Sequence, residues 1–357
     1  MSYNINVDDW YDEAVLLKAK GFSTRKIAVA LFNNENYRNR LNIFYKQESV
    51  IEDVEKRAKE LEIEDSVIGV QLQNDYSNWE VKPKPDLKTQ PKICYLDIEK
   101  SFNLSGHFGA WSQNLRQEAK FRESHILSYC YVFNDDTEIK GSIIPADELQ
   151  QDFIDCLKEG KVHTTVDELL VLELWALFNN SDVIVAYNGR GFDVKEIQAR
   201  FLMYGLPPTT PVKVIDPLLI VKDKFRLPFK SLKYVAEFLG VTQKLENSGN
   251  DLWKKATMGD EQALEDMYVY NQGDVTTLRE VYKKLQGWGN SGTNLALYND
   301  EHTSLCPHCS SDNISVIEDK FAYTSQRKYS LFRCNSCKAV LRSNRKEGSS
   351  NALVRVV

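Results

Sequence analysis

The pattern of apolar and polar positions divides the chain into stretches of different character. Residues 8–47 have helical periodicity in three short runs, DDWYDEAVLLKAK, STRKIAVALF and NYRNRLNIFYKQ, separated by Gly21 and by Asn33-Asn34. Residues 48–68 form a further helical run, which is acidic and rich in Lys and Glu. The stretch NWEVKPKPDLKTQPK has three prolines and few large apolar residues, so it predicts a linker.

From Ile93 the pattern becomes that of strands, and later of alternating strands and helices. KICYLDIEK, SHILSYCYVF and TEIKGSII read as strands, followed by the helical stretch TVDELLVLELWALFNN. The strand DVIVAYN, the helix VKEIQARFLMYG, KVIDPLLIV, the helix SLKYVAEFLG and the helical segment EQALEDMYVYNQGDVTTLREVYKKLQ follow. This order predicts an α/β fold with a mixed sheet flanked by helices.

The predicted organisation has three structured parts. A helical module (1–68) and a linker (69–90) precede the α/β domain (91–289), and a second linker (290–304), a cysteine module (305–346) and a tail (347–357) follow. The N-terminal module resembles a helix-turn-helix, and its third run carries Arg38, Arg40 and Lys46, as a helix facing nucleic acid would. A helical docking module with a solvated basic face is the alternative.

Composition narrows the class of protein. Of the 357 residues, 42% are hydrophobic and 27% charged, as in soluble globular proteins. No apolar run is long enough to cross a bilayer, and the N-terminus is acidic and polar, so the sequence predicts a cytoplasmic protein without a membrane partner. The net charge of -6 argues against a grip on nucleic acid by the whole surface, but it is compatible with a local basic track.

Acidic residues occur at three positions that suggest chemistry. Asp97 and Glu99 lie one residue apart in CYLDIEK, so a strand places both on one face. Asp193 follows a strand at the turn into a helix, and Tyr270 lies four residues before Asp274, one helical turn away. Each feature alone has an ordinary explanation as a solvent-facing pair, a turn or a helix surface. Their order along one chain favours a shared site.

That order resembles the DEDDy-type 3′–5′ exonucleases of the ribonuclease-H-like superfamily, over about residues 91–288. FKSLKYVAEFLG, before the last motif, is similar to a segment of that family. Several stretches, among them LDIEKSFNLSGHFGAWSQN and YNGRGFDV, together with the cysteine module, resemble bacteriophage-encoded exonuclease-like proteins with a C-terminal zinc ribbon. Lys100 departs from the pattern, since many relatives have Thr or Ser there. It could pair with a carboxylate or reach a phosphate.

Phosphodiester hydrolysis can be supplied by two divalent ions, and hard oxygen ligands favour Mg²⁺ or Mn²⁺. The predicted ligands are Asp97, Glu99, Asp193 and Asp274. The resemblance implies that Tyr270 orients the attacking water and that Glu99 contacts the terminal 3′ hydroxyl. Predicted substrate contacts are Asn188, Lys100 and Arg190. For Phe192 and Trp111, base stacking is an alternative, and core packing is the prediction for Phe192.

The predicted function is therefore 3′–5′ exonuclease action on DNA, at a single-stranded 3′ end, in phage replication, repair or recombination. Any partner polymerase or other replication protein would act in trans, in the host cytoplasm if the chain is phage-encoded. A ribonuclease or structure-specific endonuclease with the same site is one alternative. A non-catalytic DNA-binding or regulatory protein on the same scaffold is another, although a retired site has no reason to retain four acids.

The seven cysteines fall into two groups. Cys94, Cys130 and Cys156 are scattered and read as core residues. CPHC and CNSC predict one structural Zn²⁺ held by four thiolates, with His308 only a residue of the knuckle; the ligands are Cys306, Cys309, Cys334 and Cys337.

Basic residues accumulate in this zinc-ribbon module, with aromatic residues between them. They are Arg327, Lys328, Arg333, Lys338, Arg342, Arg345 and Lys346, interleaved with Tyr323, Tyr329 and Phe332. This composition favours nucleic-acid binding by the module. A solvated basic face is the alternative.

Overall fold

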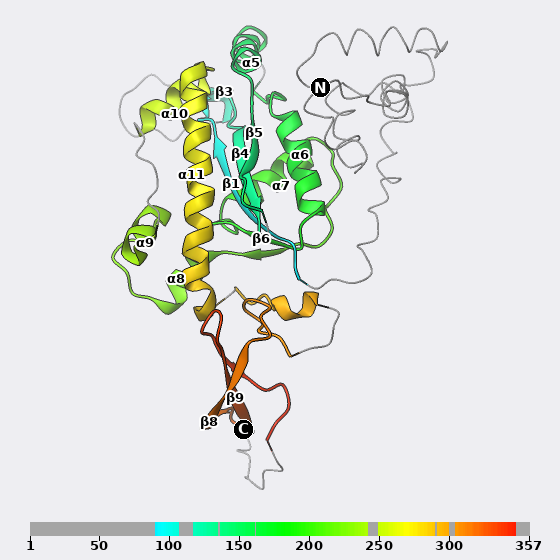
Figure 1. Cartoon of the computed structure of the whole chain (residues 1–357). Helices are drawn as coiled ribbons and strands as arrows, with labels where there is room; N and C mark the ends of the chain where they lie inside the picture. Colours follow the sequence, from blue (N-terminus) through cyan, green and yellow to red (C-terminus); the bar gives the residue numbers. More distant parts are fainter. Residues whose placement is uncertain are drawn as a thin grey trace, which may run out of the picture.

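The computed structural model describes residues 90–106, 117–134, 136–160, 162–241, 249–289, 291–299 and 304–347 (Figure 1). The predicted N-terminal module with Arg38, Arg40 and Lys46, nearly all of the first linker, Trp111 and the tail beyond residue 347 lie outside these residues. Among the described helices, none combines the length and the apolar character needed to cross a membrane.

A five-stranded mixed sheet lies at the centre, with strand order β5-β4-β1-β6-β7. The strands are β1 (Ile93–Lys100), β4 (Ile126–Phe133), β5 (Lys140–Ile143), β6 (Val183–Val185) and β7 (Lys213–Ile215). β1 pairs antiparallel with β4 and parallel with β6, while β6 and β7 are parallel and β4 and β5 antiparallel. The mixed sheet that the element order predicts is therefore confirmed. A separate two-stranded sheet pairs β2 (Leu104–Ser105) with β3 (Lys120–Arg122).

Helices cover both faces of the sheet (Figure 1). They are α5 (Ala146–Glu159), α6 (Glu168–Asn179), α7 (Asp193–Met203), α8 (Pro217–Lys224), α9 (Leu232–Leu239), α10 (Asn250–Thr257) and α11 (Glu261–Leu285). Alternation along β1 divides the two cores. Leu96 and Ile98 pack with α6 and α7, whereas Tyr95 packs with α8, α9 and α11. Asp97 and Glu99 continue the alternation of Tyr95 and so project toward the α11 face.

Local structure differs from the sequence pattern at three places. KVIDPLLIV is divided between β7 and α8, because Pro217 occupies the first helical turn and the Asp216 carboxylate caps it by accepting the Leu218 N–H at 3.0 Å. The pattern does not single out α5 or α10. Only Leu149 and Cys156 of α5 are buried, so its apolar stripe is narrow.

The cysteine module is a three-stranded antiparallel sheet in the order β10-β9-β8. Its strands are β8 (Ile314–Tyr323), β9 (Lys328–Cys334) and β10 (Val340–Arg342). The 3₁₀ turns η5 (Gln286–Trp288) and η6 (Leu295–Tyr298) connect it to α11, and a further turn, η4 (Gln117–Ala119), precedes β3.

The module packs directly against the C-terminal end of α11 (Figure 1). The Gln286 side-chain amide donates to the His308 carbonyl at 2.9 Å, and His308 Nδ1 donates back to the Gln286 carbonyl at 2.8 Å. A Cβ on Gly287 would lie 2.1 Å from the Cys337 carbonyl oxygen, so this close approach requires glycine. His308 therefore does more than occupy a knuckle, because it fastens the module to the helix that carries Tyr270 and Asp274.

Candidate active site

Three of the four predicted acids meet where α11 crosses β1. Carboxylate oxygens of Asp97 and Glu99 on β1, and of Asp274 on α11, all lie within 4.8 Å of one another. The strand period explains the first two, which share a face, and α11 covers that face. Oxygen donors at this spacing fit a divalent cation such as Mg²⁺ or Mn²⁺.

Asp193, the fourth predicted acid, lies beside this cluster but outside the group of three. It begins α7, is only 3% exposed and accepts a hydrogen bond from the backbone of Ile98, which stands between Asp97 and Glu99. Burial raises the pKa of Asp193 to about 7, and the negative charges of Asp216 and Glu196 add to the effect. A bound cation would lower the pKa of Asp193, since it favours the ionised carboxylate.

The loop leading to Asp193 is held by a buried carboxylate. Asp216 accepts hydrogen bonds from the backbone N–H groups of Asn188, at 2.9 Å, and Arg190, at 3.4 Å. Asn188 has a φ of 62°, a left-handed conformation that Asn tolerates better than most residues. The Arg190 guanidinium donates to the carbonyls of Val214 and Ser291, which gives it a structural role. Substrate contacts of Asn188 and Arg190 stay predictions.

Two neighbours of the acids do not follow from the sequence motifs. The Asn271 side chain, fully buried, donates to Oδ2 of Asp97 at 2.6 Å. Trp253 Nε1 donates to Oε2 of Glu99 at 3.1 Å, and its ring packs edge-on against Tyr270 with centroids 5.5 Å apart. Asn271 could have been suspected, because it lies inside the Tyr270–Asp274 motif. Trp253 lies on α10, far from both motifs in sequence, and has no such signal.

Lys100 forms an ion pair with Glu196, with Nζ and Oε2 2.5 Å apart. Its ammonium also lies 5.6 Å from the centre of the Phe192 ring. Phe192 is 40% exposed, so the prediction that it packs in the core is wrong. It occupies the turn just before α7, where Asp193 and Val194 take the buried positions instead.

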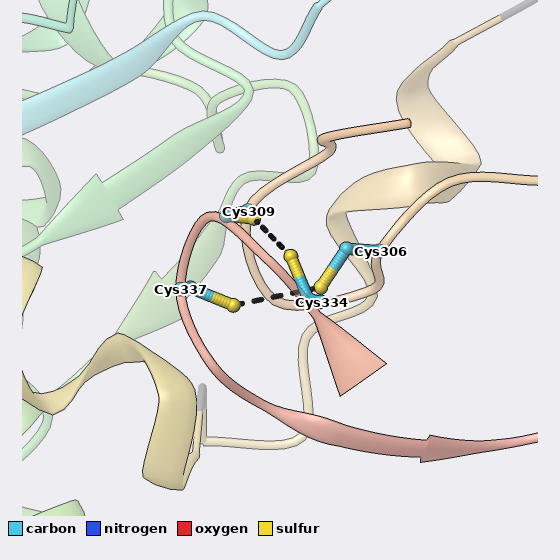
Figure 2. A group of neighbouring side chains, drawn as sticks. All are labelled: Cys306, Cys309, Cys334 and Cys337. Atoms are coloured by element: carbon cyan, nitrogen blue, oxygen red, sulfur yellow. Dashed lines mark hydrogen bonds between the residues drawn. The ribbon is translucent and has the colours of Figure 1, made fainter. Parts of the chain in front are cut away.

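The four cysteines of the ribbon converge on one point (Figure 2). Sγ atoms of Cys306 and Cys337, and of Cys309 and Cys334, are 3.6 Å apart. A disulfide requires about 2 Å, whereas a tetrahedron with zinc–sulfur bonds of about 2.3 Å has edges of about 3.8 Å. The spacing therefore fits a metal centre. The three other cysteines are buried, as predicted; they are Cys94, Cys130 and Cys156.

The ribbon's aromatic residues are only partly available to a ligand. Tyr323 is 72% exposed, but Tyr329 is buried and the Arg342 guanidinium covers its ring at 4.3 Å. Lys328 stacks on Phe321 in the same way, at 3.4 Å. Tyr329 therefore cannot serve as the stacking surface that the sequence suggests, because its partner is an arginine of the same module.

Comparison with known families covers part of this architecture. Residues 146–286 match RNase_H_2, of the RNase_H superfamily. The chain contains a ribonuclease-H-like domain. The matched residues include Asp193, Tyr270 and Asp274, while β1 with Asp97 and Glu99 precedes them. RNase H-like nucleases usually use divalent metals, and the oxygen donors of Asp97, Glu99 and Asp274 fit such ions.

Similarity to a solved polymerase structure is low. A family B DNA polymerase from the hyperthermophilic archaeon Pyrobaculum calidifontis matches 57% of this chain at 18% identity, with a TM-score of 0.35. The chain spans only 26% of that polymerase. No curated protein matches the chain.

Proposed function

We propose that the protein is a DEDDy-type, metal-dependent 3′–5′ exonuclease that hydrolyses phosphodiester bonds of DNA from a single-stranded 3′ end. The observation that supports this most directly is the group formed by Asp97, Glu99 and Asp274, whose oxygens lie within 4.8 Å of one another. Like charges repel, and burial makes the repulsion costlier, so the arrangement makes physical sense where cations neutralise it.

Asp97, Glu99, Asp193 and Asp274 would hold two Mg²⁺ or Mn²⁺ ions. Two such ions neutralise charge on the phosphate and activate a water. Asn271 and Trp253 orient Asp97 and Glu99 through the hydrogen bonds described above. Tyr270, packed against Trp253, would position the attacking water.

The substrate would be held by groups around these acids. Glu99 would contact the terminal 3′ hydroxyl, and Asn188 the strand. Phe192, exposed on the same side as Lys100, offers a ring on which a base could stack. A phosphate contact of Lys100 would compete with its ion pair to Glu196.

The test is a digestion panel of 3′- and 5′-labelled single-stranded DNA and RNA, with a closed DNA circle, in Mg²⁺ and in Mn²⁺. We expect mononucleotide release from the 3′ end of DNA and an intact circle. Asp274→Asn should abolish hydrolysis, whereas Asp266→Asn, an exposed aspartate on the same helix, should leave it unchanged. Cutting of the circle would favour an endonuclease, preference for RNA a ribonuclease, and an active Asp274→Asn would reject the site.

The wider setting belongs to the same proposal. The zinc ribbon would carry one structural Zn²⁺, and the nuclease would serve phage DNA replication, repair or recombination with a polymerase supplied in trans. The proposal also includes the domain limits and the cytoplasmic location that the sequence predicts.

A further inference from the structure

A second basic and aromatic surface lies outside both the acid cluster and the zinc ribbon. It is formed by α8, α9 and the segment between them. Residues 222–238 contain five basic residues against two acidic ones, in a chain with a net charge of -6. We call this the α8–α9 surface, defined by the exposed side chains Lys222, Lys224, Arg226, Phe229, Lys233 and Phe238.

Two aromatic rings on this surface are largely exposed. Phe229 is 67% and Phe238 62% exposed. Phe229 packs edge-on against Tyr234, with ring centroids 5.5 Å apart, so its ring is braced rather than free. Exposed aromatic rings beside cationic side chains are the residue types that bind single-stranded nucleic acid.

The surface is rigidly connected to the candidate active site. The Tyr187 hydroxyl donates to the Lys230 carbonyl at 2.6 Å, and Tyr187 immediately precedes Asn188 in the loop that leads to Asp193. The inner side of α9 packs on α11 through Leu232 and Val235, in the same core as Val275 and Leu278. The α8–α9 surface is therefore held both to the loop that leads to Asp193 and to the helix that carries Asp274.

The opposite end of the surface leads toward the zinc ribbon. Phe225, which ends α8, packs edge-on against Trp288 with centroids 5.1 Å apart, and Trp288 is 59% exposed. Trp288 belongs to the turn that connects α11 to the ribbon. Figure 1 places α8 beside this end of α11. Exposed rings and cations thus occur on α8, on α9 and on the turn that joins α11 to the ribbon.

We propose, building on the nuclease function above, that the α8–α9 surface binds the single-stranded nucleic acid upstream of the end being hydrolysed. Phe229 and Phe238 stack on bases, and Lys222, Arg226 and Lys233 contact phosphates. Lys224 contributes less, since Asp223 already pairs with it at 2.8 Å. Stacking on rings flanked by cations is tolerant of sequence, as a nuclease that accepts many sequences requires.

The test measures binding of a labelled 20-nucleotide single-stranded DNA by anisotropy, with Ca²⁺ in place of Mg²⁺, across a salt series. Phe229→Ala should raise Kd at least about 5-fold, since stacking contributes roughly 1–3 kcal/mol per base. The triple variant Lys222→Ala/Arg226→Ala/Lys233→Ala should reduce the slope of log K against log salt by about 2, at roughly 0.7 per phosphate contact. All four side chains are exposed, so folding should be unaffected.

Matched controls are Leu157→Ala and Lys158→Ala, exposed positions on α5, which lies apart from α9 (Figure 1). Hydrolysis of the small ester thymidine 5′-(4-nitrophenyl phosphate) with Mn²⁺ measures the activity of the acid cluster without any contact to the α8–α9 surface. The variants of the α8–α9 surface should hydrolyse this ester at the wild-type rate. If the surface variants lose DNA affinity while the wild type hydrolyses no substrate, the proposed nuclease function is overturned and the proposed DNA-binding surface is supported. Unchanged Kd and salt slope in the variants, or an equal loss of small-ester hydrolysis, would overturn the surface.

Discussion

The side-chain amide of Asn271 donates a 2.6 Å hydrogen bond to Oδ2 of Asp97, joining residues 174 positions apart. Asn271 is fully buried, so this bond fixes the carboxylate in a site closed to water on that side. Outer partners of metal-binding carboxylates typically affect metal affinity or activity 10–100-fold.

Asn271→Leu should therefore raise the Mn²⁺ concentration needed for half-maximal hydrolysis by about 10-fold or more. The measurement is a metal titration of nuclease activity, with circular dichroism to verify folding. Gln262→Leu, an exposed amide on the same helix, is the control and should titrate as the wild type does. A wild-type metal requirement in Asn271→Leu would mean that Asp97 needs no orientation.

Glu173, on α6, predicts a pH dependence of stability that is separate from the acid cluster. Its pKa is raised from 4.5 to about 7 by burial, while Tyr129 donates to it at 2.9 Å. Between these two values the folded chain retains a proton that the unfolded chain has lost, so this group lowers the free energy of unfolding as pH rises through the window.

Glu173→Gln removes this titration and keeps an oxygen that accepts the Tyr129 hydroxyl. The variant should exceed the wild type in unfolding free energy above pH 7, by at most about 3 kcal/mol, and the gap should close below pH 4.5. Urea unfolding from pH 4 to 8 measures it, with the exposed Glu265→Gln as control. A difference in unfolding free energy between the variant and the wild type that does not vary with pH would contradict the raised pKa of Glu173.

The cysteine cluster predicts one zinc per chain. Cys306→Ala removes one of four converging thiols and should abolish zinc retention, because three thiolates leave the tetrahedron open. Cys156→Ala, also a buried cysteine, should retain the full content. A chromogenic chelator added after denaturation measures the metal, and full zinc in Cys306→Ala would reject the ligand set.

The sequence was most informative where a residue's role follows from local periodicity. Period two on β1 places Asp97 and Glu99 together, and period 3.6 on α11 places Tyr270 and Asp274 together. The spacing of the two CxxC pairs likewise predicts that their four thiols form one metal site. In each case, the chemistry of the residue types restricts what such neighbours can do.

Residues whose role depends on tertiary contacts were not predictable in this way. Trp253 reaches Glu99 from a helix 154 residues away, and Glu196 meets Lys100 only because α7 begins beside the end of β1. The sequence predicts a core position for Phe192, yet the turn before α7 exposes it. Side-chain type does not indicate which side of a turn faces solvent.

The ion pair between Lys100 and Glu196 distinguishes the two roles that the sequence left open for the lysine. Glu196 is one of the charges that raise the pKa of Asp193, and Lys100 compensates it. Lys100→Met would leave Glu196 uncompensated next to the acid cluster. Hydrolysis should then fall, because Asp193 resists ionisation more strongly.

A double-mutant cycle separates the alternatives. If Lys100 acts by neutralising Glu196, then Lys100→Met/Glu196→Gln should recover most of the activity lost in Lys100→Met, and its pH profile should return toward the wild type. If Lys100 binds a phosphate, the double variant should remain as impaired as Lys100→Met, with the loss in KM. The 2.5 Å pair favours recovery. Lys195→Met, an exposed lysine on the first turn of α7, provides the control for the loss of one positive charge.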